Sequence, residues 1–482
     1  MSEIAALSPT ILFRHFDRLL AIPRGSGNEA EAREYVLSWA REKGWDTRTD
    51  AVGNVVVAVP ATPGHEAAPT VVLQGHLDIV CEKHSHVGHD FRRDPIPAWV
   101  DGDLIRTRGT TLGADNGIGV AAAMAVAEDP ETVHGPLELL FTIDEETGMT
   151  GAFGLRGDML RGRVMLNLDS EDEGTLFVGC AGGGDSILHL PVTRSPAPPE
   201  ARCFEVAVSG LKGGHSGLDI DKNRGNALRI LARALVFAAP GDDLGIAALN
   251  GGSKRNAIPR EARAVVFVPG SQAPSFEARV GEFAEVMRTE LGAADPGLEI
   301  RVSEAAGSDL LPVAGSGTLL RLLLALPHGP LATSSEFPGL VQTSTNLAIV
   351  TLEGNECQVV CNSRSFIGTA MEAVRQGIRA AAELAGGTAD LVGQYPGWRP
   401  NVDSPVLQVC RETWREVSGR EALVTAIHAG LECGVLGERV PGMDMVSFGP
   451  DIRGAHSPDE HLSVSSTGRF YGYLKAVLSR LA

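Results

Sequence analysis

Consecutive apolar residues form several short runs in the first 180 positions of the chain. Runs of this kind are typical of strands that are buried on both faces of a parallel sheet. Segments whose apolar residues recur at the spacing of a helix lie between these runs. The sequence therefore predicts an α/β domain with a mostly parallel sheet covered by helices on both faces. The expected strands lie at residues 54–59, 70–80, 137–144 and 164–169.

Two of the predicted helices in this part lie at its start and in its middle. Leu12, Phe16 and Leu19 are spaced so that they share one face of a helix. Because Ser8 and Pro9 precede them, we expect Ser8 to cap this helix with Pro9 in its first turn. The alanine-rich residues 117–128 predict a second helix between two strands.

After residue 200 the pattern changes to an alternation of apolar and polar residues. Alternation predicts antiparallel strands with one buried face, and two helical spacings accompany it. The glycine- and proline-rich stretch 182–200 lies between the two patterns and predicts a linker. The strands are expected at residues 203–210, 261–268, 298–305, 347–354 and 357–366, and the helices at 226–239 and 370–386.

The order of these patterns predicts two domains, as a chain of 482 residues suggests. Residues 1–188 and 396–482 are expected to form the α/β domain, because the α/β pattern resumes near residue 400. Residues 200–395 are expected to form an antiparallel α+β domain inserted into it.

Composition and charge narrow the classes of partner. A formal net charge of -18 argues against nucleic acid or an anionic membrane, because phosphate binding needs clustered Lys and Arg. The opening residues MSEIAALSPT lack a basic segment followed by an apolar run, and no stretch approaches the roughly 20 apolar residues of a membrane span. Seven scattered cysteines fit reduced thiols. A cytoplasmic protein is therefore expected.

Polar residues follow several of the predicted strands at their carboxyl ends, where open α/β sheets place their sites. His76 and Asp78 are two positions apart, so an extended strand points both side chains to one face. His76 can then bind a metal through one nitrogen while Asp78 accepts a hydrogen bond from the other. Glu145 and Glu146 follow another strand. Because adjacent side chains point in different directions, one glutamate can bind a metal while its neighbour stays free to carry a proton.

The same stretches belong to a set of motifs that runs in order along nearly the whole chain. Together they resemble the aminoacylase and carboxypeptidase G type metallopeptidases, which use two metal ions. The resemblance implies a di-metal peptidase domain with the inserted domain as a lid. The motifs are GHLDIV, GTTLGADNGIG, TIDEETGMTGA, LNLDSEDEG, GGHSG, NSRS and AHSPDE.

The resemblance also implies the metal ligands. Asp115 would bridge two ions, with His76 and Asp169 completing one site. Glu146 and His456 would complete the other. Each ion would have three N or O ligands and an open position, which is the pattern of a catalytic site. Zinc is expected, with Mn or Co as alternatives, because such sites accept several divalent ions.

Other residues receive roles from the same resemblance. Glu145 would be the general base and Asp78 would orient His76, with a cis peptide bond between Asp115 and Asn116. In the inserted domain, His215 would donate a hydrogen bond to the tetrahedral oxyanion.

Arg364 would bind the terminal carboxylate of the substrate, a task that suits a guanidinium. Asn256 and Glu432 are further candidates for substrate contact. We expect one subunit to supply both His215 and Arg364, and a homodimer is an open alternative to a monomer.

The expected activity is cytosolic hydrolysis of unblocked dipeptides, Xaa-His included, by metal-activated water. Two alternatives share the metal site: an N-acyl-amino-acid deacylase and an aminotripeptidase. A third, a binding protein that has lost catalysis, is disfavoured because Glu145 and every expected ligand are present. Of the clustered histidines, only His76 is expected to bind metal, and His84, His86 and His89 are expected in a solvated loop.

Overall fold

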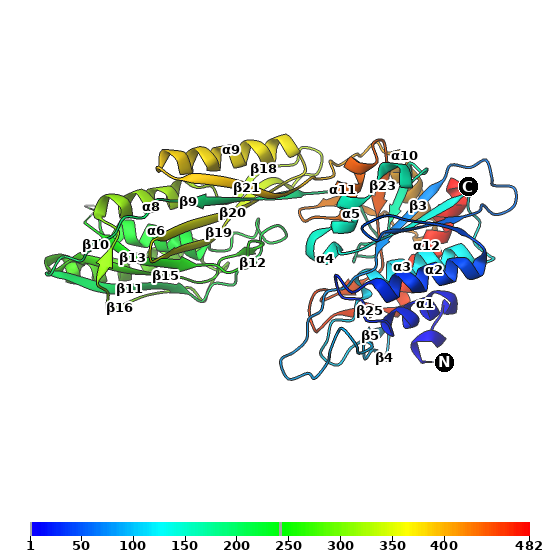
Figure 1. The fold of residues 1–482 in the computed structure, drawn as a ribbon, viewed down its shortest axis with the longest axis horizontal. Coiled ribbons are helices and arrows are strands. Elements are labelled where there is room, and N and C mark those ends of the chain that lie inside the picture. Colours follow the sequence, from blue (N-terminus) through cyan, green and yellow to red (C-terminus); the bar gives the residue numbers. More distant parts are fainter. Residues whose placement is uncertain (1, 241–242) are drawn as a thin grey trace. The chain divides into compact units, whose positions relative to one another are not determined.

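The computed structural model describes residues 2–240 and 243–482 and divides them into two compact units (Figure 1). Unit 1 comprises Met1–Cys180, Trp398–Ala426 and Leu431–Ala482. Unit 2 comprises Ala181–Gly397 and Ile427–Gly430. Within these described residues no helix combines the length and apolar character that a membrane crossing requires.

Unit 1 is built on a mixed sheet of eight strands in the order β1-β2-β6-β3-β7-β23-β8-β22. Its four central strands, β6, β3, β7 and β23, run parallel to one another, whereas β1, β2 and β8 are antiparallel to their neighbours. The expected α/β domain with its parallel centre is therefore confirmed. The bounds are β1 Asp46–Thr49, β2 Val55–Val59, β3 Val71–His76, β6 Leu137–Thr142, β7 Val164–Asn167, β8 Thr175–Cys180, β22 Leu423–Ile427 and β23 Asp444–Ser447.

The strands β3 and β6 are buried along their whole length, as their continuous apolar runs predict. Helix α3 packs on both of them, and α1 and the late helix α12 pack on α3, so segments from the two ends of the chain lie side by side (Figure 1). The helices are α1 Thr10–Leu20, α2 Ala30–Lys43, α3 Ala114–Glu128, α4 Glu145–Gly148, α5 Thr150–Gly154, α10 Pro405–Ser418, α11 Glu432–Arg439 and α12 Val464–Leu481. A small sheet adds β4 Trp99–Asp101, β5 Leu104–Arg106, β24 Ile452–Arg453 and β25 His461–Ser463.

One detail of the first helix differs from its prediction. The N-cap of α1 is Pro9, which has no side chain that can accept a hydrogen bond, and the expected cap by Ser8 is wrong. The backbone carbonyl of Pro9 accepts hydrogen bonds from Leu12 and Phe13 at 3.1 and 3.2 Å and begins the helix instead.

Unit 2 contains an antiparallel sheet in the order β16-β11-β15-β13-β19-β20-β9-β21, with β18 also paired to β19. This is the inserted antiparallel α+β fold that the alternating pattern predicts. The bounds are β9 Gly182–His189, β11 Ala201–Ser209, β13 Gly245–Gly251, β15 Ala262–Pro269, β16 Glu299–Glu304, β18 Gly329–Thr333, β19 Val341–Glu353, β20 Glu356–Ser365 and β21 Thr388–Tyr395. Two short pairs add β10 Ser195–Pro196 with β17 Asp309–Leu310, and β12 Gly214–His215 with β14 Ala257–Ile258.

The structure corrects the expected linker at residues 182–200. Its first part forms β9, which lies between β20 and β21 in the sheet and is buried over most of its length. The unit also contains two helices, α7 Ala273–Leu291 and α8 Val313–Ala325, beyond the two expected ones, α6 Ala227–Ala238 and α9 Gly368–Leu384. All four helices contribute side chains to one hydrophobic core with the sheet.

Candidate metal centre and substrate-binding residues

Asp115 lies at the start of α3 and divides its two carboxylate oxygens between two histidines. Oδ1 lies 3.1 Å from Nε2 of His76, and Oδ2 lies 3.1 Å from Nε2 of His456. The peptide bond between Asp115 and Asn116 is cis, as expected. The carboxylate is therefore shared between two groups of donors, which is the arrangement of a bridging ligand.

His76 ends strand β3 and is 1% exposed. Its Nε2 also lies 3.3 Å from Oδ1 of Asp169, and its Nδ1 lies 3.4 Å from Oδ1 of Asp78. Burial opposes a charge on this ring, yet the negative charge of Asp169 and hydrogen bonds to the three aspartates raise its pKa well above the ordinary value. The edge of the ring that carries Nε2 thus lies against the carboxylates of Asp115 and Asp169, and Asp78 contacts Nδ1 on the other edge.

Asp78 is fully buried and connects His76 to the next strand end. It accepts hydrogen bonds from the hydroxyl of Ser26 at 2.8 Å and from the backbone N–H groups of Glu145 and Glu146 at 3.0 and 3.2 Å. Burial alone would raise its pKa, but the hydrogen bond and charge of His76 and these donors outweigh burial and lower it to about 2. Asp78 therefore stays ionised and fixes both the histidine and the two glutamates.

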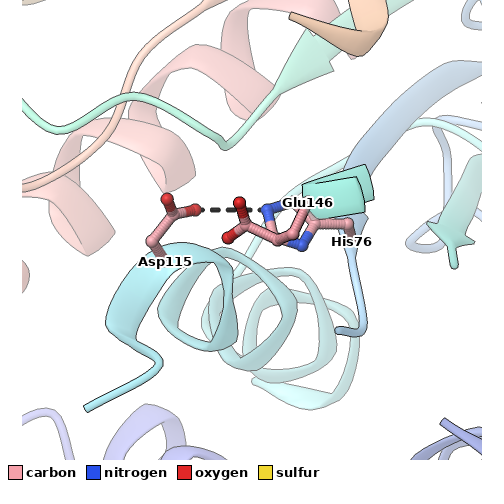
Figure 2. Close-up of side chains that lie close together, drawn as sticks. All are labelled: His76, Asp115 and Glu146. Carbon is pink, nitrogen blue, oxygen red and sulfur yellow. Dashed lines mark hydrogen bonds and ion pairs between the residues drawn. The ribbon is translucent and has the colours of Figure 1, made fainter. Parts of the chain in front are cut away.

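The adjacent glutamates take different positions, as the sequence predicts for neighbours. Oε2 of Glu146 lies 3.0 Å from Nε2 of His456, and its Oε1 is buried with no hydrogen-bond partner in the described part of the chain. Ligand atoms of His76, Asp115 and Glu146 all lie within 4.8 Å of one another, and Figure 2 shows the three side chains pointing toward one another. A buried carboxylate oxygen without a protein partner is suited to bind a cation.

The electrostatics of this cluster call for positive charge. Burial and then the charge of Asp115 raise the pKa of Asp169 to about 7. Burial, followed by the charges of Asp169 and Glu146, raises the pKa of Glu145 well above its ordinary value. Hydrogen bonds to Asp115 and Glu146 raise the pKa of His456 to about 11. Carboxylate oxygens and imidazole nitrogens at such spacing fit divalent ions such as zinc.

Two residues without a predicted role hold the turn that presents Asp115. Glu460, 3% exposed, accepts four hydrogen bonds from the backbone N–H groups of residues 112–115, at 2.7, 2.9, 2.8 and 3.2 Å. Arg24, 1% exposed, donates to the carbonyls of Leu77 and Gly113 at 2.8 and 2.7 Å. The only sequence signal for either residue is that Glu460 shares a motif with His456.

Glu432, a candidate for substrate contact, is fully buried below the strand ends. Its Oε2 accepts hydrogen bonds from Gln74 and Thr142, both at 2.6 Å, and its surface is 0% exposed. Burial raises its pKa to about 8. Because Glu432 has no exposed surface, the structure gives its contact with a substrate no support, and that role stays a prediction.

In unit 2, His215 lies in a short turn that fixes which nitrogen can donate. Its Nδ1 accepts hydrogen bonds from the backbone N–H groups of Gly217 and Leu218 at 3.2 and 3.0 Å. An accepting Nδ1 carries no proton, so the ring proton is on Nε2, where it can be donated. Asn256 is exposed, and its backbone carbonyl accepts a hydrogen bond from Ser216 at 2.8 Å.

Arg364 lies on β20, in the same unit, and is 6% exposed. Its guanidinium donates to the hydroxyl of Tyr395 at 2.9 Å and to that of Ser216 at 3.3 Å. Neither partner carries a negative charge. A buried guanidinium held by neutral groups is suited to bind an anion.

The other clustered histidines lie in the irregular segment that follows β3. His84 and His86 are exposed and stack on one another with ring centres 5.6 Å apart. His89 lies against Phe91. Among the described residues, none of these three belongs to a group of side chains spaced to hold a metal ion.

A comparison with protein families identifies the class of protein. Residues 72–480 match the model of peptidase family M20/M25/M40, so the chain belongs to this family. The chain is 41% identical to the cytosol non-specific dipeptidase of Escherichia coli strain K12, over 100% of this chain and 99% of the relative.

Two solved structures extend the comparison. The aminoacylhistidine dipeptidase of Vibrio alginolyticus is 41% identical, with a TM-score of 0.91 over 99% of this chain and 98% of that one. The Escherichia coli and Vibrio alginolyticus dipeptidases confirm the family resemblance that the motifs indicate. A tripeptidase of Staphylococcus aureus subsp. aureus mu50 shares only the fold, with 16% identity and a TM-score of 0.57 over 98% of this chain and 99% of that one.

Proposed function

We propose that this chain is a metal-dependent dipeptidase that hydrolyses unblocked dipeptides, those ending in histidine included. The observation that carries the proposal is its full-length similarity to two proteins named as dipeptidases. The cluster of carboxylates and histidines in unit 1 supports it, because its donors fit two divalent ions that share Asp115. Zinc is the proposed metal.

The distances in the cluster support the ligand set that the motifs imply. Asp115 would be shared by the two ions, His76 and Asp169 would complete the first position, and Glu146 and His456 would complete the second. Two such ions, when bound, polarise the scissile carbonyl and lower the pKa of a bound water toward about 7.

The remaining steps use side chains of the chain itself. Glu145, placed by its backbone hydrogen bond to Asp78, takes the proton of the attacking water and delivers it to the leaving amine. Burial and the neighbouring carboxylates raise the pKa of Glu145 well above that of an ordinary carboxyl group, which makes it a stronger base toward the proton of the water. His215 donates from Nε2 to the oxyanion, and Arg364 binds the terminal carboxylate.

Asn256 is proposed to contact the substrate as well, since it is exposed beside the His215 turn. Replacing Asn256 by Ala should then raise KM and leave the metal content unchanged.

The test is hydrolysis of β-Ala-His, Leu-Leu, Gly-Gly-Leu and N-acetyl-Leu by chelator-treated protein, before and after addition of Zn or Mn. We expect both free dipeptides to be cleaved only after metal is restored. In Glu145→Ala, turnover should fall by about 10²-fold or more while metal binding persists, which is the size of effect that general bases contribute. Cleavage of the tripeptide or of N-acetyl-Leu alone would identify an aminotripeptidase or a deacylase instead. A full metal complement without turnover of any substrate would identify a binding protein.

A further inference from the structure

Arg364 is a buried cation whose surroundings lack a matching anion. Its two hydrogen-bond partners are the hydroxyls of Tyr395 and Ser216, and no carboxylate of the described residues pairs with it. The nearby Asp185 is already engaged by Arg255 and Asn362, at 2.9 and 2.8 Å. Buried charges in proteins are normally paired, so the anion that completes this site belongs to a ligand.

His428 lies on the same face of the sheet as this guanidinium. Ser344 is directly opposite Arg364 in the pairing of β19 with β20, so the two side chains point to one face. The hydroxyl of Ser344 lies 2.7 Å from Nε2 of His428, and the His428 ring packs edge-on against Phe366 with ring centres 5.6 Å apart.

The His215 turn also contacts His428. A Cβ atom on Gly217 would lie 2.1 Å from the carbonyl oxygen of His428, so the backbones of the two segments are in direct contact. His215, Arg364 and His428 therefore gather in one part of unit 2.

The two ring nitrogens of His428 differ, since Nε2 lies against Ser344 and Nδ1 has no partner within hydrogen-bond geometry among the described residues. The residue is 5% exposed, and Nδ1 is a buried atom without a hydrogen bond to any described residue. Burial, followed by the charges of Arg364 and His215, lowers the pKa of His428 to about 3 and outweighs the nearby backbone of Val341, which acts in the opposite direction, so the ring is neutral. We assign the tautomer in which the Ser344 hydroxyl donates to Nε2 and the single ring proton lies on Nδ1.

We propose that His428 is a further substrate-binding residue, whose Nδ1–H donates a hydrogen bond to the terminal carboxylate that Arg364 binds. This inference rests on the proposed function, because it assigns a second donor to the same carboxylate. One cation and one neutral donor match the single charge and two oxygens of a carboxylate. In a terminal carboxamide the single oxygen goes to the charged guanidinium of Arg364, and the NH₂ group then faces the Nδ1–H of His428, donor against donor.

Two substitutions separate the two ring nitrogens. In His428→Gln the side-chain amide can replace Nε2 and keep the contact with Ser344, but the Nδ1 donor is lost. In His428→Asn the amide N–H lies near the position of Nδ1. His328 offers a matched control, because it is a partly buried histidine of the same unit whose pKa is also lowered, to about 4, and whose ring contacts Asn226 at 3.2 Å.

The experiment compares Leu-Leu with its carboxamide in kinetics and in calorimetric binding to the Glu145→Ala protein. We expect His428→Gln to weaken Leu-Leu binding by about 10-fold or more, the usual effect of losing a hydrogen bond to a charged group, with kcat little changed and the carboxamide unaffected. His428→Asn should recover part of the loss, and His328→Gln should change neither ligand.

Equal weakening of Leu-Leu and its carboxamide by His428→Gln, or no weakening of either, would overturn the role of His428. Failure of the proposed function has a different signature, since the wild-type protein would then cleave neither dipeptide. The binding arm still decides the role of His428 in that case, because it needs no turnover.

Discussion

The two oxygens of Asp115 face different histidines, and this division predicts how single substitutions change metal content. Asp115 is the only proposed ligand common to both positions, whereas Asp169 and Glu146 each serve one. Removing a shared ligand leaves each ion with two protein ligands, and removing an unshared one leaves its partner ion intact.

We therefore expect Asp115→Asn to lose both ions and Asp169→Asn and Glu146→Gln to lose one each. The measurement is metal per protein after equilibrium dialysis at a fixed free metal concentration. Identical stoichiometry in all three variants would show that Asp115 does not bridge.

Glu432 gives a second prediction at this scale, concerning stability and pH. Its pKa rises from 4.5 to about 8 on folding because the carboxyl is buried. A raised carboxyl pKa means that the folded state binds the proton of Glu432 more tightly than the unfolded state does. Protonation of Glu432 therefore stabilises the fold fully below pH 4.5, and this stabilisation is lost as the pH rises toward 8. Each pKa unit corresponds to about 1.4 kcal/mol, so the loss is on the order of a few kcal/mol.

The free energy of unfolding of the metal-free wild type should therefore fall more between pH 5 and pH 8 than that of Glu432→Gln. Urea unfolding of both proteins in the presence of chelator measures the difference. If Glu432→Gln loses as much stability over this pH range as the wild type, then a group other than Glu432 causes the pH dependence.

At the scale of elements, the turn before α3 is held from a distant part of the chain. Glu460 follows His456 by four residues and binds the four N–H groups that precede and include Asp115. The segment that supplies the proposed ligand His456 thus also positions the proposed ligand Asp115 through Glu460.

Replacing Glu460 by Gln should weaken metal binding by about 10-fold or more, because an amide oxygen accepts from backbone N–H groups less strongly than a carboxylate and its NH₂ group would face donors. Glu138→Gln is the matched control. Glu138 is 2% exposed and accepts hydrogen bonds from the backbone N–H groups of Arg161 and Gly162 at 2.8 and 3.0 Å, at the opposite end of β6.

Competition with a chromogenic chelator measures the affinity of both variants. The expected result is weaker binding in Glu460→Gln alone. Equal loss in the two variants would reduce the role of Glu460 to general stability.

Elements with a strong periodic signal could be predicted from the sequence, and so could the residues at their ends. The strand before His76 and the one before Glu145 have continuous apolar runs, and the motifs supplied the proposed ligands. Strand β9 was missed because its glycines are typical of a linker. A Cβ atom on Gly183 would lie 2.5 Å from the Tyr395 hydroxyl, so close packing requires glycine here. Glu460 and Arg24 were missed because they bind backbone groups, which leave no pattern in the sequence.

At the scale of the molecule, all five proposed metal ligands belong to unit 1, whereas His215, Arg364 and His428 belong to unit 2. A ligand stabilises the part of the protein that holds it, so metal should raise the stability of unit 1. The five tryptophans, Trp39, Trp45, Trp99, Trp398 and Trp414, also belong to unit 1. Tryptophan fluorescence therefore reports on the metal-binding unit alone.

We expect chelation to lower the midpoint of thermal unfolding that tryptophan fluorescence reports. In circular dichroism, the transition that belongs to unit 2 should keep its midpoint. Circular dichroism includes the helices and strands of both units. Shifts of equal size in both signals would show that the units unfold as one.

The insertion of unit 2 between the parts of unit 1 has a consequence for synthesis. The ribosome completes residues 181–397 after it has made His76, Asp115, Glu146 and Asp169 and before it makes His456. A growing chain therefore has the ligands of the first proposed position early, but both positions await the segment that carries His456 and Glu460, the carboxylate that fixes Asp115. Hydrolytic activity is thus withheld from the nascent chain until its substrate-binding unit has already been made.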